Sequence, residues 1–136
     1  SGGQLGNNSL INSSVPVAVS TAGVLAGRSV TSVSTGSQFS CAVANNAAFC
    51  WGINGTGQLG NNSLTSSSVP VAVSTSGVLA GRTVSALSAG SSHACAIADG
   101  LAFCWGQNTQ GRLGNNTVTN SSVPVAVSTA GVLSDR

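Results

Sequence analysis

The four cysteines are the residues of this sequence best placed to carry out chemistry, and their spacing indicates disulfide bonds. They form two pairs, Cys41 with Cys50 and Cys95 with Cys104. Asp99-Gly100, midway in the second pair, is typical of a two-residue hairpin turn, because both central residues of a type I′ turn require positive φ. Such a turn sets the cysteines opposite each other at a non-hydrogen-bonded pair, where Cα atoms approach to about 4.5 Å. Disulfide-bonded Cα atoms lie about 4.4–6.8 Å apart, so the sequence predicts one cross-strand disulfide in each hairpin.

The other ionisable residues form no catalytic or metal-binding pattern. His93, the single histidine, lies two residues before Cys95 and shares its expected strand face. A cysteine–histidine nucleophilic pair is the alternative, but a sulfur in a disulfide is no nucleophile. We therefore interpret His93 as a structural residue that bonds neighbouring backbone. Zinc sites use shorter cysteine spacings, and two aspartates without a glutamate offer no paired carboxylates. We expect no catalytic residue, no metal, no cofactor and no enzymatic activity.

Six asparagines begin Asn-x-Ser/Thr sequences, which accept N-linked glycans in a eukaryotic secretory pathway. They are Asn7, Asn12, Asn54, Asn61, Asn115 and Asn120. In a bacterium the same residues serve as loop residues that cap turns, and composition does not choose between the two interpretations.

The elements that position these residues repeat along the chain. Cys41 recurs as Cys95, and Pro16 recurs as Pro70 and Pro124, which gives a period of 54 residues. The period predicts two full repeat units and part of a third. The units run over residues 1–54, 55–108 and 109–136. In repeat proteins each unit buries its apolar faces against its neighbours, so we expect these units to pack on one another.

Each unit is predicted to contain short strands and no helix. β-Branched residues lie between Gly, Asn and Ser turns, and no apolar period of 3.6 residues is present. In the first unit the expected strands are Val15–Ser20, Val30–Thr35, Phe39–Ala44 and Ala47–Gly52. Four antiparallel strands in a repeat of about 50 residues favour an all-β propeller blade over a solenoid coil.

Aromatic and small residues alternate in the hairpins, which indicates how successive blades pack. Phe49 and Trp51 share one strand face, Cys50 lies on the other, and Phe103 and Trp105 repeat the aromatic pair. An aromatic face that packs on a small-residue face suits stacked blades, so these four aromatics are predicted to lie in the blade core. The alternative is that Trp51 and Trp105 line a ligand site.

The composition excludes several kinds of partner and favours a location outside the cell. Charged residues make up 4% of the sequence and the net charge is +2, too weak and too scattered for nucleic-acid binding. No apolar run approaches the ~18 residues of a membrane span, so we expect no membrane insertion. Four cysteines in hairpin-compatible pairs favour an oxidising compartment. The predicted location is therefore extracellular or cell surface.

The second unit resembles the regulator of chromosome condensation repeat. The family pattern has a glycine, two further residues and then a histidine, followed by Trp-Gly-x-Asn and Gly-Gln-Leu-Gly. The matching residues are Gly90, His93, Trp105, Gly106, Asn108, Gly111, Leu113 and Gly114. The first unit has Phe39 in place of the histidine and Asn46 in place of the turn glycine, and Arg112 replaces a glutamine in the last loop.

This resemblance covers nearly the whole chain and implies a β-propeller with four strands in each blade. Secreted bacterial members of the family are similar in their cysteine pairs and their Ser/Thr/Asn-rich loops, and they resemble binding or surface scaffolds. The founding eukaryotic member acts on a small GTPase and on chromatin through residues outside the repeat pattern, and none of those is matched here.

Two functions are expected from these observations. The first is a non-enzymatic structural protein that assembles with copies of itself into a filament or other higher-order array. The alternative is a secreted propeller scaffold that binds another protein or a glycan through its loops. The loop Gln-Leu-Gly-Asn-Asn-Ser-Leu recurs almost unchanged, which favours the first. The strand Val123, Pro124, Val125, Ala126 and Val127 is predicted to pair with the sheet edge of another subunit, as in β-augmentation.

Overall fold

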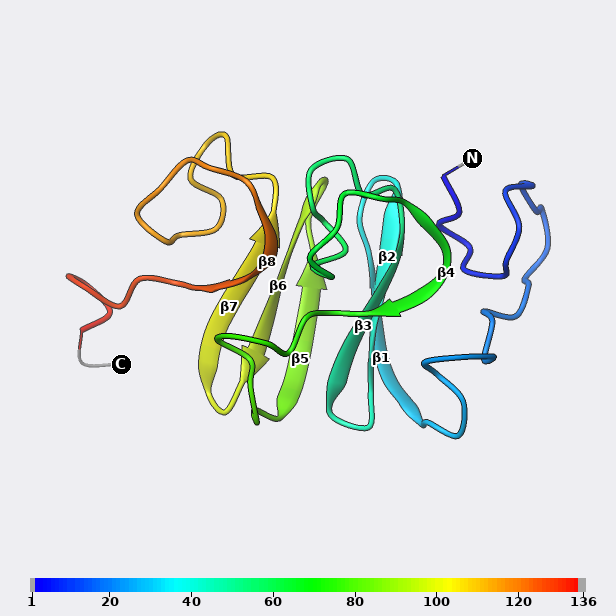
Figure 1. The fold of residues 1–136 in the computed structure, drawn as a ribbon, viewed down its shortest axis with the longest axis horizontal. Coiled ribbons are helices and arrows are strands. Elements are labelled where there is room, and N and C mark those ends of the chain that lie inside the picture. The colour runs from blue at the N-terminus through cyan, green and yellow to red at the C-terminus, as the bar shows by residue number, and fades with distance from the viewer. Residues whose placement is uncertain (1, 135–136) are drawn as a thin grey trace.

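The computed structural model describes residues 2–134 and contains two four-stranded antiparallel sheets in tandem (Figure 1). Sheet 1 consists of β1 (Val30–Thr35), β2 (Phe39–Ala44), β3 (Ala47–Gly52) and β4 (Ser67–Ala72). Sheet 2 consists of β5 (Val84–Ala89), β6 (His93–Ala98), β7 (Leu101–Gly106) and β8 (Ser121–Ala126). Strands follow chain order in each sheet, and the described residues contain no helix, hence none that could span a membrane. The predicted all-β class with four-stranded sheets is confirmed.

Both central hairpins turn where the sequence predicts. Asn45 and Asn46 have φ values of 46° and 63°, and Asp99 and Gly100 have 49° and 79°. Asparagine, aspartate and glycine tolerate this left-handed region better than other residues, so each turn closes in two residues. The register of the whole hairpin follows from the turn.

The register places the cysteines opposite each other. Cys41 pairs with Cys50 across β2 and β3, and Cys95 pairs with Cys104 across β6 and β7. Both pairs are disulfide-bonded, with 4.0 Å between the Cα atoms. The two cross-strand disulfides expected from the spacing are therefore present in the structure.

The sheets keep the period of the sequence but are offset from the units 1–54 and 55–108. Sheet 1 takes its fourth strand, β4, from the second unit, and sheet 2 takes β8 from the third. Each fourth strand pairs with the strand that ends the preceding hairpin, as Phe49 pairs with Ala72. Successive units are therefore joined through a shared sheet.

The strand predicted at Val15–Ser20 is not formed. The sequence Ser-Ser-Val-Pro-Val-Ala-Val-Ser occurs at residues 13–20, 67–74 and 121–128, and the second and third copies contain β4 and β8. Those copies pair with the hairpin that precedes them, whereas no described residues form such a hairpin before residue 13. A strand needs a partner for its backbone groups, so an identical sequence without one stays in solvent.

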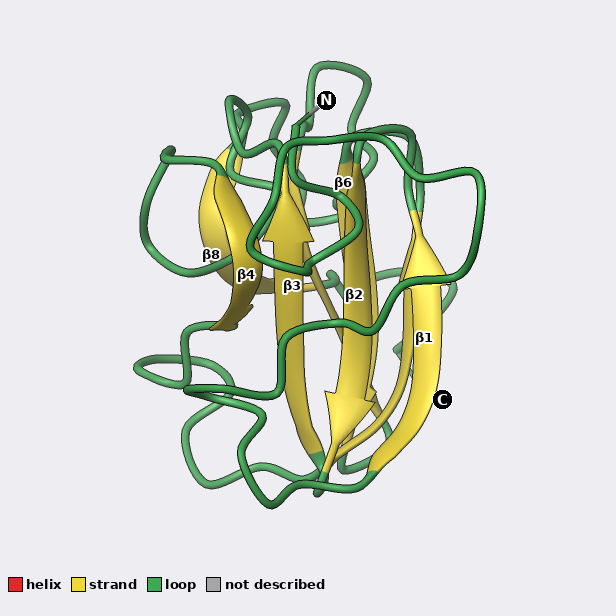
Figure 2. Cartoon of the chain, turned by 90° about the vertical axis from the view of Figure 1, so that its right-hand side faces the viewer, coloured by secondary structure: helices red, strands yellow, loops and turns green. Residues whose placement is uncertain are grey.

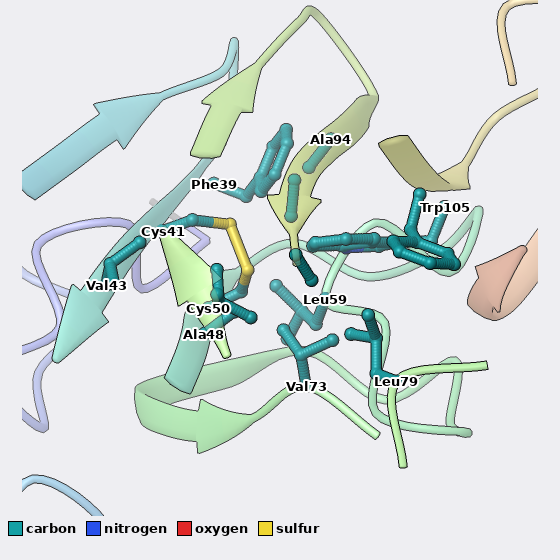
Figure 3. Close-up of a cluster of buried hydrophobic side chains, with 14 residues drawn as sticks. Phe39, Cys41, Val43, Ala48, Cys50, Leu59, Val73, Leu79, Ala94 and Trp105 are labelled. Carbon is teal, nitrogen blue, oxygen red and sulfur yellow. A yellow bond between two sulfur atoms is a disulfide. The ribbon is translucent and has the colours of Figure 1, made fainter. Parts of the chain in front are cut away.

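Each sheet has two chemically different faces, and the sheets stack through unlike faces (Figure 3). The disulfide face of sheet 1 carries Phe39, Cys41, Val43, Ala48 and Cys50. The tryptophan face of sheet 2 carries Ala94, Ala96, Ala98, Phe103 and Trp105. These ten residues are buried together with Leu59, Val73, Leu79 and Val84 in one core cluster. Small residues on one face leave room for the aromatic rings of the other, so the two surfaces interdigitate.

A buried asparagine organises the loop after each hairpin. The side-chain oxygen of Asn54 accepts the amide hydrogen of Leu59 at 2.9 Å, and its nitrogen donates to the carbonyl oxygens of Ser63 and Thr65 at 2.8 and 3.0 Å. Asn108 repeats this network in the next unit, including the bond from the amide of Leu113. These networks hold the leucines inside the fold.

Candidate functional site

The ionisable residues form no reactive cluster in the described part of the chain. No group of three or more His, Cys, Asp or Glu side chains is assembled there, and all four cysteines are in disulfides. His93 and Cys95 lie on the same face of β6, as predicted, with the sulfur engaged in its disulfide. Among the described residues, therefore, no cysteine thiol is free and no such group could hold a metal ion.

His93 fills a space left by a glycine and does not make the backbone bond expected of it. A Cβ at Gly90 would lie 2.2 Å from the ring carbon Cε1, so only glycine fits beside the ring. In sheet 1, Gly36 leaves the same space for Phe39. The Nδ1 atom of His93 is buried and has no hydrogen-bond partner among the described residues. The expected bond is wrong because packing, not polarity, selects the ring here, as the phenylalanine of sheet 1 illustrates.

This environment predicts that acid weakens the fold. Burial, with a smaller contribution from the Arg112 guanidinium, lowers the pKa of His93 below its usual 6.5. The unfolded chain then binds a proton that the folded chain resists, so stability is full above about pH 6.5 and is lost as the pH falls below it. Urea unfolding between pH 7 and pH 5 measures this. His93→Phe, which copies Phe39, should remove the dependence, and an unchanged slope in that variant would contradict the assignment.

The four predicted aromatics are buried, each beside a glycine-rich loop or a leucine. Trp51 Nε1 donates to the carbonyl oxygen of Gln4 at 2.9 Å, and Trp105 Nε1 donates to that of Gln58 at 3.0 Å. Phe49 packs with Leu25 and Ala44, while Phe103 belongs to the core between the sheets. Both indoles are enclosed by protein, with their polar atoms satisfied.

The disulfide face of sheet 2 is open, although the same face of sheet 1 is the centre of the core. It carries His93, Cys95, Ile97, Ala102 and Cys104. Val43 is 2% exposed in sheet 1, whereas its equivalent, Ile97, is 39% exposed. Leu79 is 3% exposed, whereas Leu133, its equivalent one repeat later, is 39% exposed. An apolar surface whose counterpart is buried in sheet 1 is therefore exposed on sheet 2.

Sheet 2 has two hollows on its surface. At the equivalent positions of sheet 1, one repeat earlier, sheet 2 packs against the surface. One, of about 170 Å³, is lined by Ala86, Leu87, Ser88, Cys95, Ala96 and Ile97. The other, of about 330 Å³, is lined by Gly100, Leu101, Ala102, Phe103, Ala126, Val127, Thr129 and Leu133. In sheet 1 the equivalent strands β1, β2 and β3 contact β5, whose Val84 amide donates to the carbonyl oxygen of Asn46 at 2.9 Å. The hollows thus have the position of a missing neighbouring strand.

The opposite end of the molecule has the complementary surface. Val30 on β1 is 49% exposed, whereas its equivalent on β5, Val84, is 4% exposed and packs into the core. Val33 on β1 is also exposed, while its equivalent, Leu87, packs on the core. The chain therefore exposes, at its two ends, copies of both halves of the interface that it buries between its sheets.

The segment Val123–Val127, predicted to pair with another subunit, pairs here with a strand of its own chain. Its strand portion is part of β8, and Val125 pairs with Cys104 of β7. The other edge of β8 has no partner strand among the described residues. Pairing with another subunit through this strand stays a prediction, and it would use that second edge or replace the present pairing.

Exposure predicts a fixed order of disulfide reduction. Cys41 and Cys50 are fully buried between the sheets, whereas Cys95 is partly exposed on the open face. Thiol–disulfide exchange requires access to sulfur. A limiting amount of reductant, followed by alkylation and mass spectrometry, should label Cys95 and Cys104 first. Equal labelling of both pairs in the folded protein would contradict this order.

The six Asn-x-Ser/Thr asparagines differ in accessibility. Asn54 is fully buried in its network, so it cannot accept a glycan in the folded chain. Asn12 and Asn120 are exposed. The sequence pattern did not identify Asn54 and Asn108 as structural residues, although their recurrence after Trp-Gly in both units was the available signal.

Tandem four-stranded antiparallel sheets, stacked face to face with the fourth strand taken from the next unit, define two blades of the β-propeller type. The model of the regulator of chromosome condensation (RCC1) repeat matches residues 1–43, 45–97 and 99–133. The chain belongs to this family. The family expectation from the sequence is confirmed.

Known proteins share both the sequence pattern and the fold. The E3 ubiquitin-protein ligases HERC2 of Homo sapiens and Mus musculus are each 34% identical to this chain over 117 residues, covering 85% of the chain and 2% of the ligase. Human WBSCR16 has 25% identity and a TM-score of 0.63, over 73% of this chain and 26% of that protein. Prp20p of Saccharomyces cerevisiae has 16% identity and a TM-score of 0.67, over 79% and 27%. The chain therefore spans a small part of each relative.

Proposed function

We propose that this chain is a non-enzymatic, extracellular structural module that self-assembles by stacking blades of different copies. The observation that carries the proposal is the pair of exposed surfaces at its two ends. The disulfide face of sheet 2 is open, and the surface of β1 that would pack on such a face is open too. Unlike surfaces on opposite ends give head-to-tail contacts, which close into a ring or continue as a filament.

The interface inside the chain supplies a template for this contact. Between the sheets, the Val84 amide donates to the Asn46 carbonyl and the Ala89 amide donates to Ser34 Oγ, both at 2.9 Å. Shifted by one repeat, the Val30 amide of a second copy would donate to the carbonyl oxygen of Gly100. The Thr35 amide of that copy would donate to Ser88 Oγ. Both proposed acceptors lie beside the open face of sheet 2.

The low charge of the surface and the disulfides also support the proposal. The sequence has only four arginines and two aspartates, with no lysine or glutamate, so there is little charge repulsion between copies. Two disulfides suit an oxidising environment outside the cytosol.

Sedimentation velocity of the 136-residue chain tests the proposal. We expect the chain to associate increasingly as its concentration rises through the micromolar range. Ile97→Asp should weaken the association constant at least about tenfold, because it places a charge on the docking face. Val78→Asp is the matched control, since Val78 is 38% exposed, much as Ile97 is, but lies between β4 and β5 and on neither open surface. A wild-type chain that stays monomeric throughout would overturn the proposal.

A scaffold that binds another protein is the second candidate. It is supported by the yeast neighbours: Prp20p is described with binding properties to Gsp1p and histones, and yeast RCC1 (Prp20) is described as bound by Kap60. Those chains have 16% identity to this one, so the likeness extends to the fold. A monomeric chain that captured a defined protein or glycan through its loops would favour this alternative.

A further inference from the structure

Residues 3–28, here called the cap, cover the tryptophan face of sheet 1 on the side away from sheet 2 (Figure 2). The carbonyl oxygen of Gln4 accepts hydrogen bonds from Trp51 Nε1 and Ser40 Oγ, both at 2.9 Å. Leu25 packs on Phe49, and the Arg28 guanidinium lies 5.2 Å from the centre of the same ring. The cap contributes no strand to the sheet that it covers.

The connecting segment, residues 57–82, makes the same contacts on sheet 2. The carbonyl oxygen of Gln58 accepts from Trp105 Nε1, and the Arg82 guanidinium lies 5.3 Å from the centre of the Phe103 ring. The backbone bonds repeat as well: Asn8 donates to Ser68 under the cap, and Asn62 donates to Ser122 under the connecting segment, both at 2.9 Å. The cap therefore occupies the place where a segment joined to a preceding blade would lie.

A third copy of this segment lies at the other end of the chain. Residues 120–133 are identical in sequence to residues 12–25 of the cap, and Leu113-Gly114 repeats Leu5-Gly6. This third segment, residues 111–133, is anchored to sheet 2 through β8, but no tryptophan face lies beyond it among the described residues. It thus has the residues that cover a tryptophan face elsewhere in this structure, while its own surface faces no tryptophan among the described residues.

These two segments cannot both remain in place when copies dock end to end. With sheet 1 of one copy on sheet 2 of another, the third segment of one and the cap of the other fall on the same tryptophan face. We propose that assembly occurs by exchange: the third segment of one copy replaces the cap of the next on Trp51 and Phe49. This inference rests on the proposed self-assembly and specifies its contact.

The cap is the segment that leaves, because it is held less firmly. The third segment contributes β8, which is hydrogen-bonded along β7, whereas residues 13–20 of the cap form no strand. Exchange then keeps every strand of sheet 2, and it replaces the contacts of Gln4, Gly6 and Leu25 with sheet 1 by those of Arg112, Gly114 and Leu133. It also buries Leu133 on Phe49, as Leu25 is buried now.

Two matched glycine variants test the exchange by sedimentation velocity. Gly6 has φ of 67° and a Cβ there would lie 2.6 Å from Trp51 Nε1, so Gly6→Ala loosens the cap and should lower the concentration for half-association about tenfold. Gly114 would take that position in the exchanged state, since a Cβ at its equivalent Gly60 lies 2.7 Å from the Trp105 ring. Gly114→Ala should therefore raise the same concentration about tenfold.

Hydrogen–deuterium exchange of the wild-type assembled fraction provides the second measurement. The amides of Asn8 and Ser20 are hydrogen-bonded in the cap, so exchange predicts that they lose protection in the assembly while Asn62 and Ser74 keep it. Assembly with a protected cap, or with equal effects of the two glycine variants, would overturn the exchange and leave self-assembly standing. No assembly of the wild-type chain or either variant would overturn both.

Discussion

Trp105→Ala should lower the free energy of unfolding by about 3–5 kcal/mol, which is a large part of the stability of a small domain. The Trp105 side chain is fully buried in the core between the sheets (Figure 3). Its removal leaves a cavity against Leu59, and it also leaves the carbonyl oxygen of Gln58 without its donor. Equilibrium unfolding in urea, followed by circular dichroism, measures the change.

Trp51→Ala is the matched control for this variant. Trp51 makes the equivalent hydrogen bond to Gln4, but it lies under the cap and not between two sheets. We expect about half the loss seen for Trp105→Ala, since the cap can collapse onto the cavity more easily than a packed sheet can. A loss below about 1 kcal/mol for Trp105→Ala would show that the stack of sheets does not hold the fold together.

The hairpins could be predicted from the sequence because their determinants are local. Asp99-Gly100 fixes the turn, the turn fixes the register, and the register fixes the partner of Cys95. Each step depends on residues within one short segment. The repeat then extended the result to the first hairpin, although Asn45 and Asn46 replace the turn sequence.

The fourth strand could not be located from local sequence in the same way. One octapeptide forms β4 and β8 but no strand at residues 13–20, so its conformation depends on whether a hairpin lies beside it. The open face has the same origin. Val43 and Ile97 are similar side chains at equivalent positions, and their exposure differs because sheet 2 covers the first and nothing described covers the second. Periodicity predicts which residues are suited to burial, and only the number of stacked blades decides which are buried.

The buried asparagines were missed for a different reason. Asn54 stands in a Gly/Asn/Thr-rich loop, where a polar residue is ordinarily exposed, and its Asn-x-Thr sequence suggested a glycan acceptor instead. In the structure its amide group replaces the backbone partners that a strand or helix would give this loop. A buried side chain that satisfies several backbone groups at once leaves no periodic signature.

Asn54→Ala is therefore expected to lower the free energy of unfolding by about 3 kcal/mol, since an unsatisfied buried polar group costs roughly 1–3 kcal/mol. The substitution leaves the Leu59 amide and the carbonyl oxygens of Ser63 and Thr65 without their partner. Leu59 packs in the core between the sheets, so loosening this loop also weakens the stack. Urea unfolding monitored by tryptophan fluorescence reports the effect, because Trp105 lies against the same loop.

Two comparison variants separate the network from the loss of a side chain. Asn54→Asp keeps the shape and the acceptor for Leu59 but removes the donors to Ser63 and Thr65, so it should be destabilising as well. Asn12→Ala changes an exposed asparagine of the same sequence type and should stay within about 0.5 kcal/mol of the wild type. If Asn54→Ala behaved like Asn12→Ala, the loop would be held by its glycine turns alone. We instead expect a difference in the free energy of unfolding between the two variants. That difference would show that the buried amide of Asn54 holds Leu59, and with it the core between the blades, in place.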